Sequence, residues 1–400
     1  MIDFAQIEAA RERLQDKVLL SPCPRFEHLS QLTGADIYIK LENLQITGSF
    51  KVRGALNTLL QLSAEQKAHG VVAASAGNHA QAVAYGAKLL HIHATIVMPE
   101  TTPLIKIEGT RAYGANIVLA GQNYDEAFQV AQTLQQDKDL CLIHAFDDER
   151  VMAGQATIGL ELLQQLPDLD CAIIPVGGGG LIAGIASAIK ELKPEIEIIG
   201  VEAERLPAMR ESLAAGNPLL LPAKSTIADG IAVSQVGQRT LPIAQRYVSA
   251  MVTVSENEIA HALLYLLERE KTLAEGAAAV GIAALYNHHI PDLRGKKVAV
   301  IISGGNIDMT RLSLILERGL EEEQRIAHIT IVMPDTPGSV AELAQLTREH
   351  QAKILGIRSN HHFGEVELGE VELTLALETK GRQDVEALLA AIRSQGYVVR

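Results

Sequence analysis

A lysine lies where an expected strand passes into an expected helix. The segment Lys40-Leu-Glu-Asn-Leu-Gln-Ile-Thr-Gly-Ser-Phe-Lys51 ends on it, and the helix is expected to begin near Phe50. Lys51 then stands in the first helical turn, where the positive end of the helix dipole lowers the pKa of an ammonium group. A lysine of lowered pKa can serve as a neutral amine nucleophile. Spacing alone leaves open an ordinary solvated lysine.

A second segment, of small and polar residues, could bind an anion. It directly follows the apolar run at 71–75, opens a helical pattern, and consists of Ser75, Ala76, Gly77, Asn78 and His79. Free backbone N–H groups at the start of a helix suit a carboxylate or a phosphate. Asn78 is also expected to cap this helix, and capping alone is the alternative.

Four consecutive glycines between a strand and a helix make the third candidate. They are Gly177, Gly178, Gly179 and Gly180, followed by Leu181. Such a backbone can wrap a phosphate while the helix dipole faces it. The same residues fit a loose dinucleotide fingerprint with Glu202 about 20 residues on, so a nicotinamide-dependent amino-acid dehydrogenase is a rival interpretation.

Ser303 is the last residue of the run Lys297-Val-Ala-Val-Ile-Ile-Ser303, the last apolar run of the first 325 residues. It stands at the carboxyl end of an expected strand, where sheets flanked by helices bind ligands. Its hydroxyl could hydrogen-bond a heteroaromatic nitrogen. A plain strand-to-helix turn is the alternative.

The elements that position these segments are buried strands alternating with helices. The apolar runs lie at 37–41, 71–75, 94–98, 116–120, 140–144, 171–176, 197–202, 251–254 and 297–303. Continuous runs rich in Val and Ile are typical of strands buried on both faces, so the fold class is α/β with parallel or mostly parallel sheets. Because nine strands are many for one open sheet, two α/β domains are expected.

The last 75 residues follow a different pattern. After the charged run at 316–325, the order strand, helix, strand, strand, helix, strand predicts a βαββαβ ferredoxin-like unit. Its first strand turns at Pro334-Asp-Thr-Pro-Gly338, just before a helix.

Composition excludes several classes of function. The 400 residues carry 35 Lys and Arg against 48 Asp and Glu, a net charge of −13, so no nucleic-acid footprint is expected. No apolar run is long enough for a membrane span. Three scattered cysteines fit a reducing cytoplasm. A small-molecule substrate is the expected partner.

The four segments, in this order, resemble the fold-type II pyridoxal-phosphate enzymes, and among them the threonine dehydratase (threonine ammonia-lyase) family. The likeness covers residues 5–320, and the stretch Thr47-Gly-Ser-Phe-Lys-Val-Arg-Gly-Ala55 is its most specific part. It implies a two-domain carbon–nitrogen lyase that uses pyridoxal 5'-phosphate. The implied reaction converts L-threonine to 2-oxobutanoate and ammonia, and L-serine to pyruvate.

The resemblance also implies roles for single residues. Lys51 would form the Schiff base and act as the base at the substrate Cα, with Phe50 packed on the pyridine ring. Asn78 would bind the phenolic oxygen, and Ser303 would face the pyridine nitrogen. The substrate carboxylate would be held by Ser75, Ala76, Gly77, Asn78 and His79. The phosphate would be held by Gly177, Gly178, Gly179, Gly180 and Leu181. Since a serine cannot stabilise a pyridinium, direct β-elimination would be favoured.

The tail resembles an ACT domain, an amino-acid-sensing module. This implies a catalytic core at 1–325, with a smaller subdomain at roughly 45–150 inserted in the larger one, and a regulatory domain at 326–400. Gly338 is the expected effector contact, with isoleucine or valine as candidate effectors. Family members associate, so a homodimer or homotetramer is expected.

Two positions depart from the pattern of the serine racemases of this family. Those enzymes have a second serine where this chain has Ala76, so racemisation is expected to be minor. Their cation site pairs a glutamate matching Glu202 with an aspartate where this chain has Ala208, so no divalent metal is expected, while a monovalent ion remains open. A serine dehydratase or racemase, and a non-catalytic amino-acid sensor, stay as alternatives.

Overall fold

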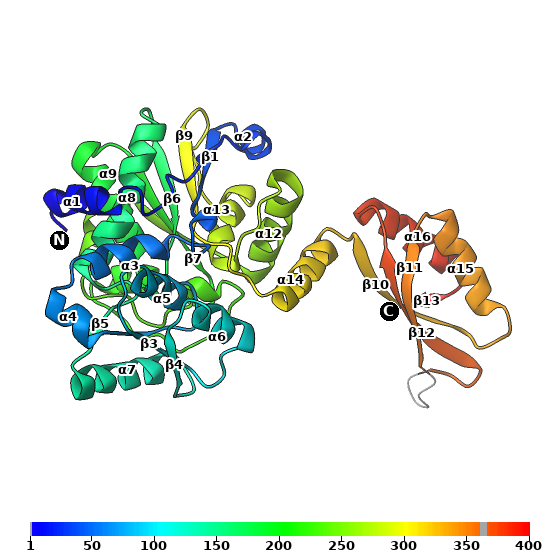
Figure 1. Ribbon diagram of the computed structural model, residues 1–400. Helices are drawn as coiled ribbons and strands as arrows, with labels where there is room; N and C mark the ends of the chain where they lie inside the picture. Colours follow the sequence, from blue (N-terminus) through cyan, green and yellow to red (C-terminus); the bar gives the residue numbers. More distant parts are fainter. Residues whose placement is uncertain (1, 361–365) are drawn as a thin grey trace. The chain divides into compact units, whose positions relative to one another are not determined.

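The computed structural model describes residues 2–360 and 366–400. The chain forms two compact units, Met1–Met309 and Thr310–Arg400. Both are shown in Figure 1. Within the described residues, no helix is both long and apolar enough to cross a membrane.

A five-stranded parallel sheet organises the larger part of the first unit. Its strand order is β1-β9-β6-β7-β8, and every pairing is parallel. The strands are β1 (Asp36–Leu41), β6 (Cys171–Pro175), β7 (Glu197–Ala203), β8 (Ala250–Val254) and β9 (Lys297–Ile302). Central strand β6 is buried at every position, which explains its unbroken apolar sequence.

A second parallel sheet has the order β4-β3-β2-β5. Its strands are β2 (Val71–Ala74), β3 (Ala94–Met98), β4 (Asn116–Leu119) and β5 (Cys141–Leu142). The predicted α/β fold class with parallel sheets is therefore confirmed, and the nine apolar runs form strands of these two sheets, although β5 is only two residues long where a run of five was expected.

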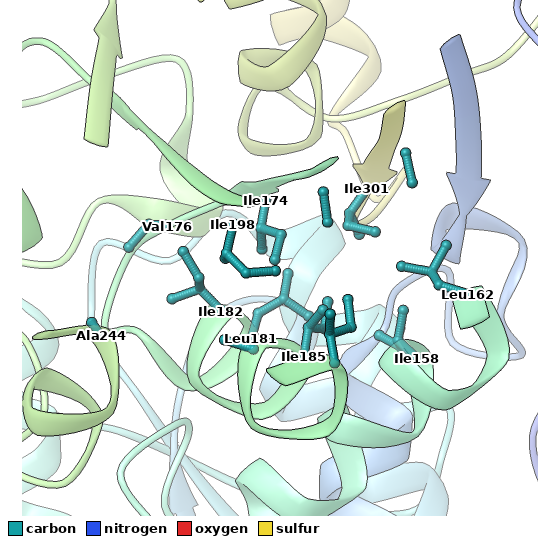
Figure 2. Packing of buried hydrophobic residues seen from close by; sticks show 14 of the residues in the cluster. Ile158, Leu162, Ile174, Val176, Leu181, Ile182, Ile185, Ile198, Ala244 and Ile301 are labelled. Atoms are coloured by element: carbon teal, nitrogen blue, oxygen red, sulfur yellow. The ribbon is translucent and has the colours of Figure 1, made fainter. Parts of the chain in front are cut away.

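Helices cover both sheets, as parallel strands require. They are α1 (Phe4–Leu14), α2 (Glu27–Thr33), η1 (Glu42–Leu44), α3 (Lys51–Leu60), α4 (Ala64–His69), α5 (Asn78–Leu89), α6 (Leu104–Arg111), α7 (Tyr124–Lys138), α8 (Glu149–Gln165), α9 (Gly180–Leu192), α10 (Ala208–Ala215), η2 (Asp229–Ile231), α11 (Thr240–Tyr247), α12 (Glu256–Glu270) and α13 (Gly276–Tyr286). Figure 2 shows α9 side chains packing with α8 and the larger sheet, through Ile182, Ile185, Ile158, Leu162, Ile174, Ile198 and Ile301.

The second unit begins within α14 (Met309–Glu322) and has the predicted βαββαβ order. Its elements are β10 (Ile326–Pro334), α15 (Ser339–Glu349), β11 (Lys353–Asn360), β12 (Glu370–Glu378), α16 (Arg382–Ser394) and β13 (Val398–Val399). The sheet order β11-β12-β10-β13 is antiparallel throughout. Alternate residues of β12 are buried against the helices, as one-sided packing requires.

Candidate functional site

Lys51 lies at the junction of the two parallel layers. The N–H of Phe50 donates to the Ser303 carbonyl at 3.0 Å, which ties the start of α3 to the end of β9. The Lys51 ammonium donates to the Ala145 carbonyl at 2.8 Å, in the segment that follows β5. Lys51 therefore connects the carboxyl ends of strands from both sheets, the edge at which such sheets bind ligands.

Burial lowers the pKa of Lys51 to about 8, while the charge of Glu275 opposes the shift. From the sequence, the dipole of α3 was expected to lower this pKa; in the structure, removal of the ammonium from water is the largest cause. Lys51 is therefore not an ordinary solvated lysine on the surface.

Asn78 is the first residue of α5 and does not cap it, so the capping prediction was wrong: the N-cap is Gly77, without a side-chain hydrogen bond. The Asn78 amide instead donates to both carboxylate oxygens of Glu275, at 2.8 and 3.0 Å. Asn306 donates to the Asn78 side-chain oxygen at 2.9 Å. Through these contacts α5, which covers the smaller sheet, is joined to two parts of the larger sheet's layer. Glu275 stands at the start of α13, and Asn306 follows β9.

Glu275 and Asn306 are site residues that the sequence argument missed. Glu275 directly precedes the apolar helix α13, and its N–H donates to the Gly304 carbonyl at 3.0 Å. Burial, helped by the nearby charge of Asp229, raises the pKa of Glu275 to about 7, although the hydrogen bond from Asn78 opposes the shift. One feature of the sequence could have drawn attention to Glu275. It is an acidic residue directly before the fully apolar run 276–285, a position where carboxylates normally cap a helix.

The other residues of the Ser75–His79 segment are partly engaged. The Ser75 N–H donates to the Val97 carbonyl at 3.0 Å, and the Gly77 N–H to the Ser75 hydroxyl at 3.1 Å. His79 Nε2 lies 2.9 Å from the Ile143 carbonyl oxygen, and burial lowers the pKa of this imidazole to about 3. Because the first N–H groups of a helix lack intrahelical acceptors, those at the start of α5 can face a ligand.

The glycine segment between β6 and α9 forms a tight cradle. Gly179 has φ +94°, the left-handed region. A Cβ on Gly178 would lie 2.5 Å from the Phe146 ring, and one on Gly177 would lie 2.9 Å from Ile231 Cα. The side chain of Leu181 belongs to the apolar core (Figure 2), so Leu181 can offer the cradle only its backbone.

These residues fit pyridoxal phosphate. The cradle admits only glycine, and the first N–H groups of α9 suit a phosphate. Thr47 Oγ1 and Ser49 Oγ, just before Lys51, are buried without a hydrogen-bond partner among the described residues. Unpaired buried polar atoms beside an amine of lowered pKa are expected where a polar ligand binds.

Glu202 lies on β7. Its carboxylate oxygens accept the N–H groups of Met209 and Arg210 at 2.7 and 2.9 Å, at the start of α10. Burial raises the pKa of Glu202 to about 7. This side chain therefore anchors α10.

Comparisons with known proteins agree with the geometry. Residues 15–304 match the family described as pyridoxal-phosphate dependent enzyme. The chain belongs to this family. That membership removes the nicotinamide-dependent dehydrogenase from consideration and makes pyridoxal phosphate the cofactor.

Single relatives sharpen this assignment. The chain is 45% identical over 400 residues to L-threonine ammonia-lyase of Thermotoga maritima, covering all of this chain and 99% of the relative. A protein of the same name from Geobacter sulfurreducens is 45% identical over 399 residues, covering 100% and 99% of the two chains. The processed threonine deaminase isoform 2 of Solanum lycopersicum has a TM-score of 0.75 at 40% identity, over 79% of this chain and 92% of that one. Serine racemase of Dictyostelium discoideum has a TM-score of 0.73 at 35% identity, over 77% and 99%.

The raised pKa of Glu275 makes stability depend on pH. The folded state holds this proton more tightly than the unfolded chain, so the free energy of unfolding falls as pH rises from 4.5 to about 7. Glu275→Gln removes this contribution. Between pH 5 and pH 8, the stability of E275Q relative to wild type should rise by about 2–3 kcal/mol, measured by urea unfolding. A difference that stays constant with pH would contradict the assignment.

Proposed function

We propose that this pyridoxal-phosphate enzyme deaminates L-threonine to 2-oxobutanoate and ammonia, and L-serine to pyruvate. The observation that carries the proposal is the position of half-buried Lys51. Its amine donates to Ala145, just after the smaller sheet's β5, and the preceding residue, Phe50, bonds to Ser303 at the end of β9. Two full-length relatives named L-threonine ammonia-lyase, each 45% identical to this chain, support the choice of substrate.

In this proposal Lys51 first binds the cofactor and then takes the proton from the substrate Cα. A pKa of about 8 leaves an appreciable fraction of neutral amine near neutral pH, as a base requires. The Ala145 carbonyl accepts a hydrogen bond from the Lys51 amine and so can orient it. Lys51 thus needs no separate general base to become neutral.

Pyridoxal phosphate, when bound, supplies a ring that draws electrons away from the substrate Cα. Its phosphate would be held by the backbone of Gly177, Gly178, Gly179, Gly180 and Leu181. Phe50 would pack on the ring, and Ser303 would face the ring nitrogen. Asn78 would turn one of its two amide protons from Glu275 to the phenolic oxygen. Glu275 holds the Asn78 amide at 2.8 Å and thereby its orientation.

The substrate carboxylate would be held by Ser75, Ala76, Gly77, Asn78 and His79. The Ser75 N–H is already bonded to Val97, so Ser75 would contribute its hydroxyl, and the helix-start N–H groups would supply the rest. Buried His79 stays neutral and ties α5 to the strand end at Ile143.

The test is an assay of the purified full-length chain with L-threonine and L-serine, followed by 2-oxo acid and ammonia release. Equal amounts of 2-oxobutanoate and ammonia from threonine, with visible cofactor absorbance, are expected. A chain that binds the cofactor but releases no 2-oxo acid from either amino acid would refute the proposal.

A serine racemase is the second candidate, favoured by the 35% identical Dictyostelium enzyme. Ala76 weighs against it, because a methyl group cannot return a proton to the opposite face of the substrate Cα. D-serine formation should stay well below pyruvate formation in the same assay. Appreciable D-serine would make racemisation the better description.

We further propose that residues 326–400 are an ACT-type regulatory domain attached to a catalytic core at 1–325, whose smaller subdomain spans roughly 45–150. The βαββαβ order and the sheet order β11-β12-β10-β13 support this. Gly338 is the N-cap of α15 with φ +109°, and a Cβ there would meet nothing within 4 Å, so a ligand carboxylate can approach the backbone. Isoleucine and valine are the candidate effectors.

Truncation tests this regulation. A chain ending at residue 325 should keep threonine deamination within about threefold of the full chain and lose its response to isoleucine and valine. Substrate saturation curves of both chains, with and without each amino acid, measure this. A truncated enzyme that still responds would place the effector site in the catalytic core.

We also propose a cytoplasmic homodimer or homotetramer. The cysteines Cys23, Cys141 and Cys171 are free thiols, which suits a reducing compartment. Exposed Leu20, Leu44 and Ile46 supply apolar surface of the kind that subunits cover. Sedimentation equilibrium of the full chain measures the subunit number.

A further inference from the structure

A buried threonine hydroxyl hydrogen-bonds the backbone of the glycine cradle, Gly177–Gly180. Thr240, the first residue of α11, is fully buried. Its Oγ1 donates to the Gly178 carbonyl at 2.7 Å and lies 3.2 Å from the Gly237 carbonyl. A hydroxyl carries one proton, so the shorter contact is the hydrogen bond. The Gly237 N–H donates to the same Gly178 oxygen at 3.1 Å.

Two donors on one carbonyl determine which way the peptide between Gly178 and Gly179 faces. In a planar trans peptide, the C=O and the following N–H point in opposite directions. With the Gly178 oxygen turned toward the 237–240 segment, the Gly179 N–H is turned away from it. Gly179 then takes its left-handed conformation and leads into α9, so successive N–H groups can converge on an anion.

The 237–240 segment is itself held by the segment that binds Lys51. Asp147 accepts the N–H of Arg239 at 2.8 Å and that of Gln238 at 3.1 Å. A Cβ on Gly237 would lie 2.3 Å from Asp147 Oδ1, so the approach leaves room only for glycine. The preceding Phe146 packs its ring on Gly178.

Three consecutive residues thus link the reactive amine to the cradle. Ala145 accepts the hydrogen bond of Lys51, Phe146 packs on the glycines, and Asp147 holds the segment that carries Thr240. Asp147 is half-buried, and both of its carboxylate oxygens are used. These successive contacts set the position of the Lys51 amine relative to the glycine cradle.

We propose that Thr240 is a positioning residue for binding of the cofactor phosphate, acting through the Gly178 carbonyl, and that Asp147 supports it by holding the segment at 237–239. The inference rests on the proposed function in one respect, that the glycine cradle receives the phosphate. It predicts a defect confined to ligands that carry a phosphate.

The experiment compares pyridoxal phosphate with pyridoxal, which lacks the phosphate. Full-length wild type, T240V and T240S are loaded and dialysed against graded ligand concentrations, and the bound fraction is read from ligand absorbance. T240V should raise the dissociation constant for pyridoxal phosphate about 3- to 10-fold, the effect of one hydrogen bond, and leave that for pyridoxal unchanged. T240S, which keeps the hydroxyl, should bind both as wild type does.

Thr110→Val is the matched control. Thr110 is also buried and donates its hydroxyl to a backbone carbonyl, that of Lys106, at 3.0 Å in α6. T110V should leave both dissociation constants unchanged. If T240V does not fold, D147N takes its place, since an amide cannot accept at both positions, and the same phosphate-specific loss is expected.

Either of two results would overturn the proposal. T240V could bind pyridoxal phosphate as wild type does, or it could weaken pyridoxal phosphate and pyridoxal equally, which would mean a general structural role. Failure of the proposed function looks different, because wild type itself would then show no cofactor absorbance or no 2-oxo acid.

Discussion

Replacing Lys51 with alanine should abolish threonine deamination, lowering kcat by at least about 10³-fold. The variant loses the amine that donates to the Ala145 carbonyl, and with it both cofactor attachment and the base for the substrate Cα. The absorbance that depends on the lysine–cofactor bond should disappear with the activity. Steady-state kinetics and absorbance spectra of purified K51A measure the two effects.

Lys51→Arg separates nucleophilicity from charge. An arginine keeps a cation at the same place but stays protonated at any relevant pH, so K51R should be as inactive as K51A. Lys88→Ala is the matched control: Lys88 is exposed on α5, and its amine also contacts a backbone carbonyl, that of Ala112, at 3.5 Å. K88A should keep wild-type kcat. An active K51A that retains its absorbance would remove Lys51 from the mechanism.

Arg53→Met should lower the free energy of unfolding by about 3–5 kcal/mol, the largest stability effect we expect. Arg53, in the first turn of α3, is fully buried and donates to Glu42 at 2.8 Å through Nε and to Glu161 at 2.6 Å through a terminal nitrogen. Burial by itself raises the pKa of Glu42, but the charge and hydrogen bond of Arg53 hold that pKa below its ordinary value. Without Arg53, Glu42 becomes a buried carboxylate that has lost its main partner.

Urea unfolding of R53M against wild type measures this loss. Arg11→Met is the control, because the Arg11–Glu8 pair on α1 is exposed and should contribute less than about 0.5 kcal/mol. The double variant R53M/E42Q should recover part of the lost stability, since it removes the unpaired charge as well. Equal effects of R53M and R11M would show that the buried network contributes little.

The local parts of the site were predictable from the sequence. Lys51 begins a helix, and the glycines at 177–180 separate a strand from a helix, because runs of apolar residues and glycine act within a few residues of themselves. The βαββαβ order of the tail follows from the same short-range periodicity. The unbroken apolar runs likewise predicted the two parallel sheets of the first unit, because parallel strands are usually buried on both faces.

The contacts that join these segments were not predictable in the same way. Asn78 looked like a helix cap, yet its amide binds Glu275, 197 residues later in the chain. The amine of Lys51 is oriented by a carbonyl 94 residues away, and Gly178 is held by Thr240, 62 residues on. No local pattern marks such a partner, because the partner is chosen by how two sheets and their helices pack.

The sequence by itself therefore located the segments that could carry chemistry, and its resemblance to known pyridoxal-phosphate enzymes, matched over residues 15–304, gave the family and the cofactor. Only the tertiary structure decided the pKa values of the ionisable groups in the site. Burial, rather than the dipole of α3, lowers the pKa of Lys51, and burial raises that of Glu275. Desolvation depends on everything packed around a group, and that is a property of the folded chain.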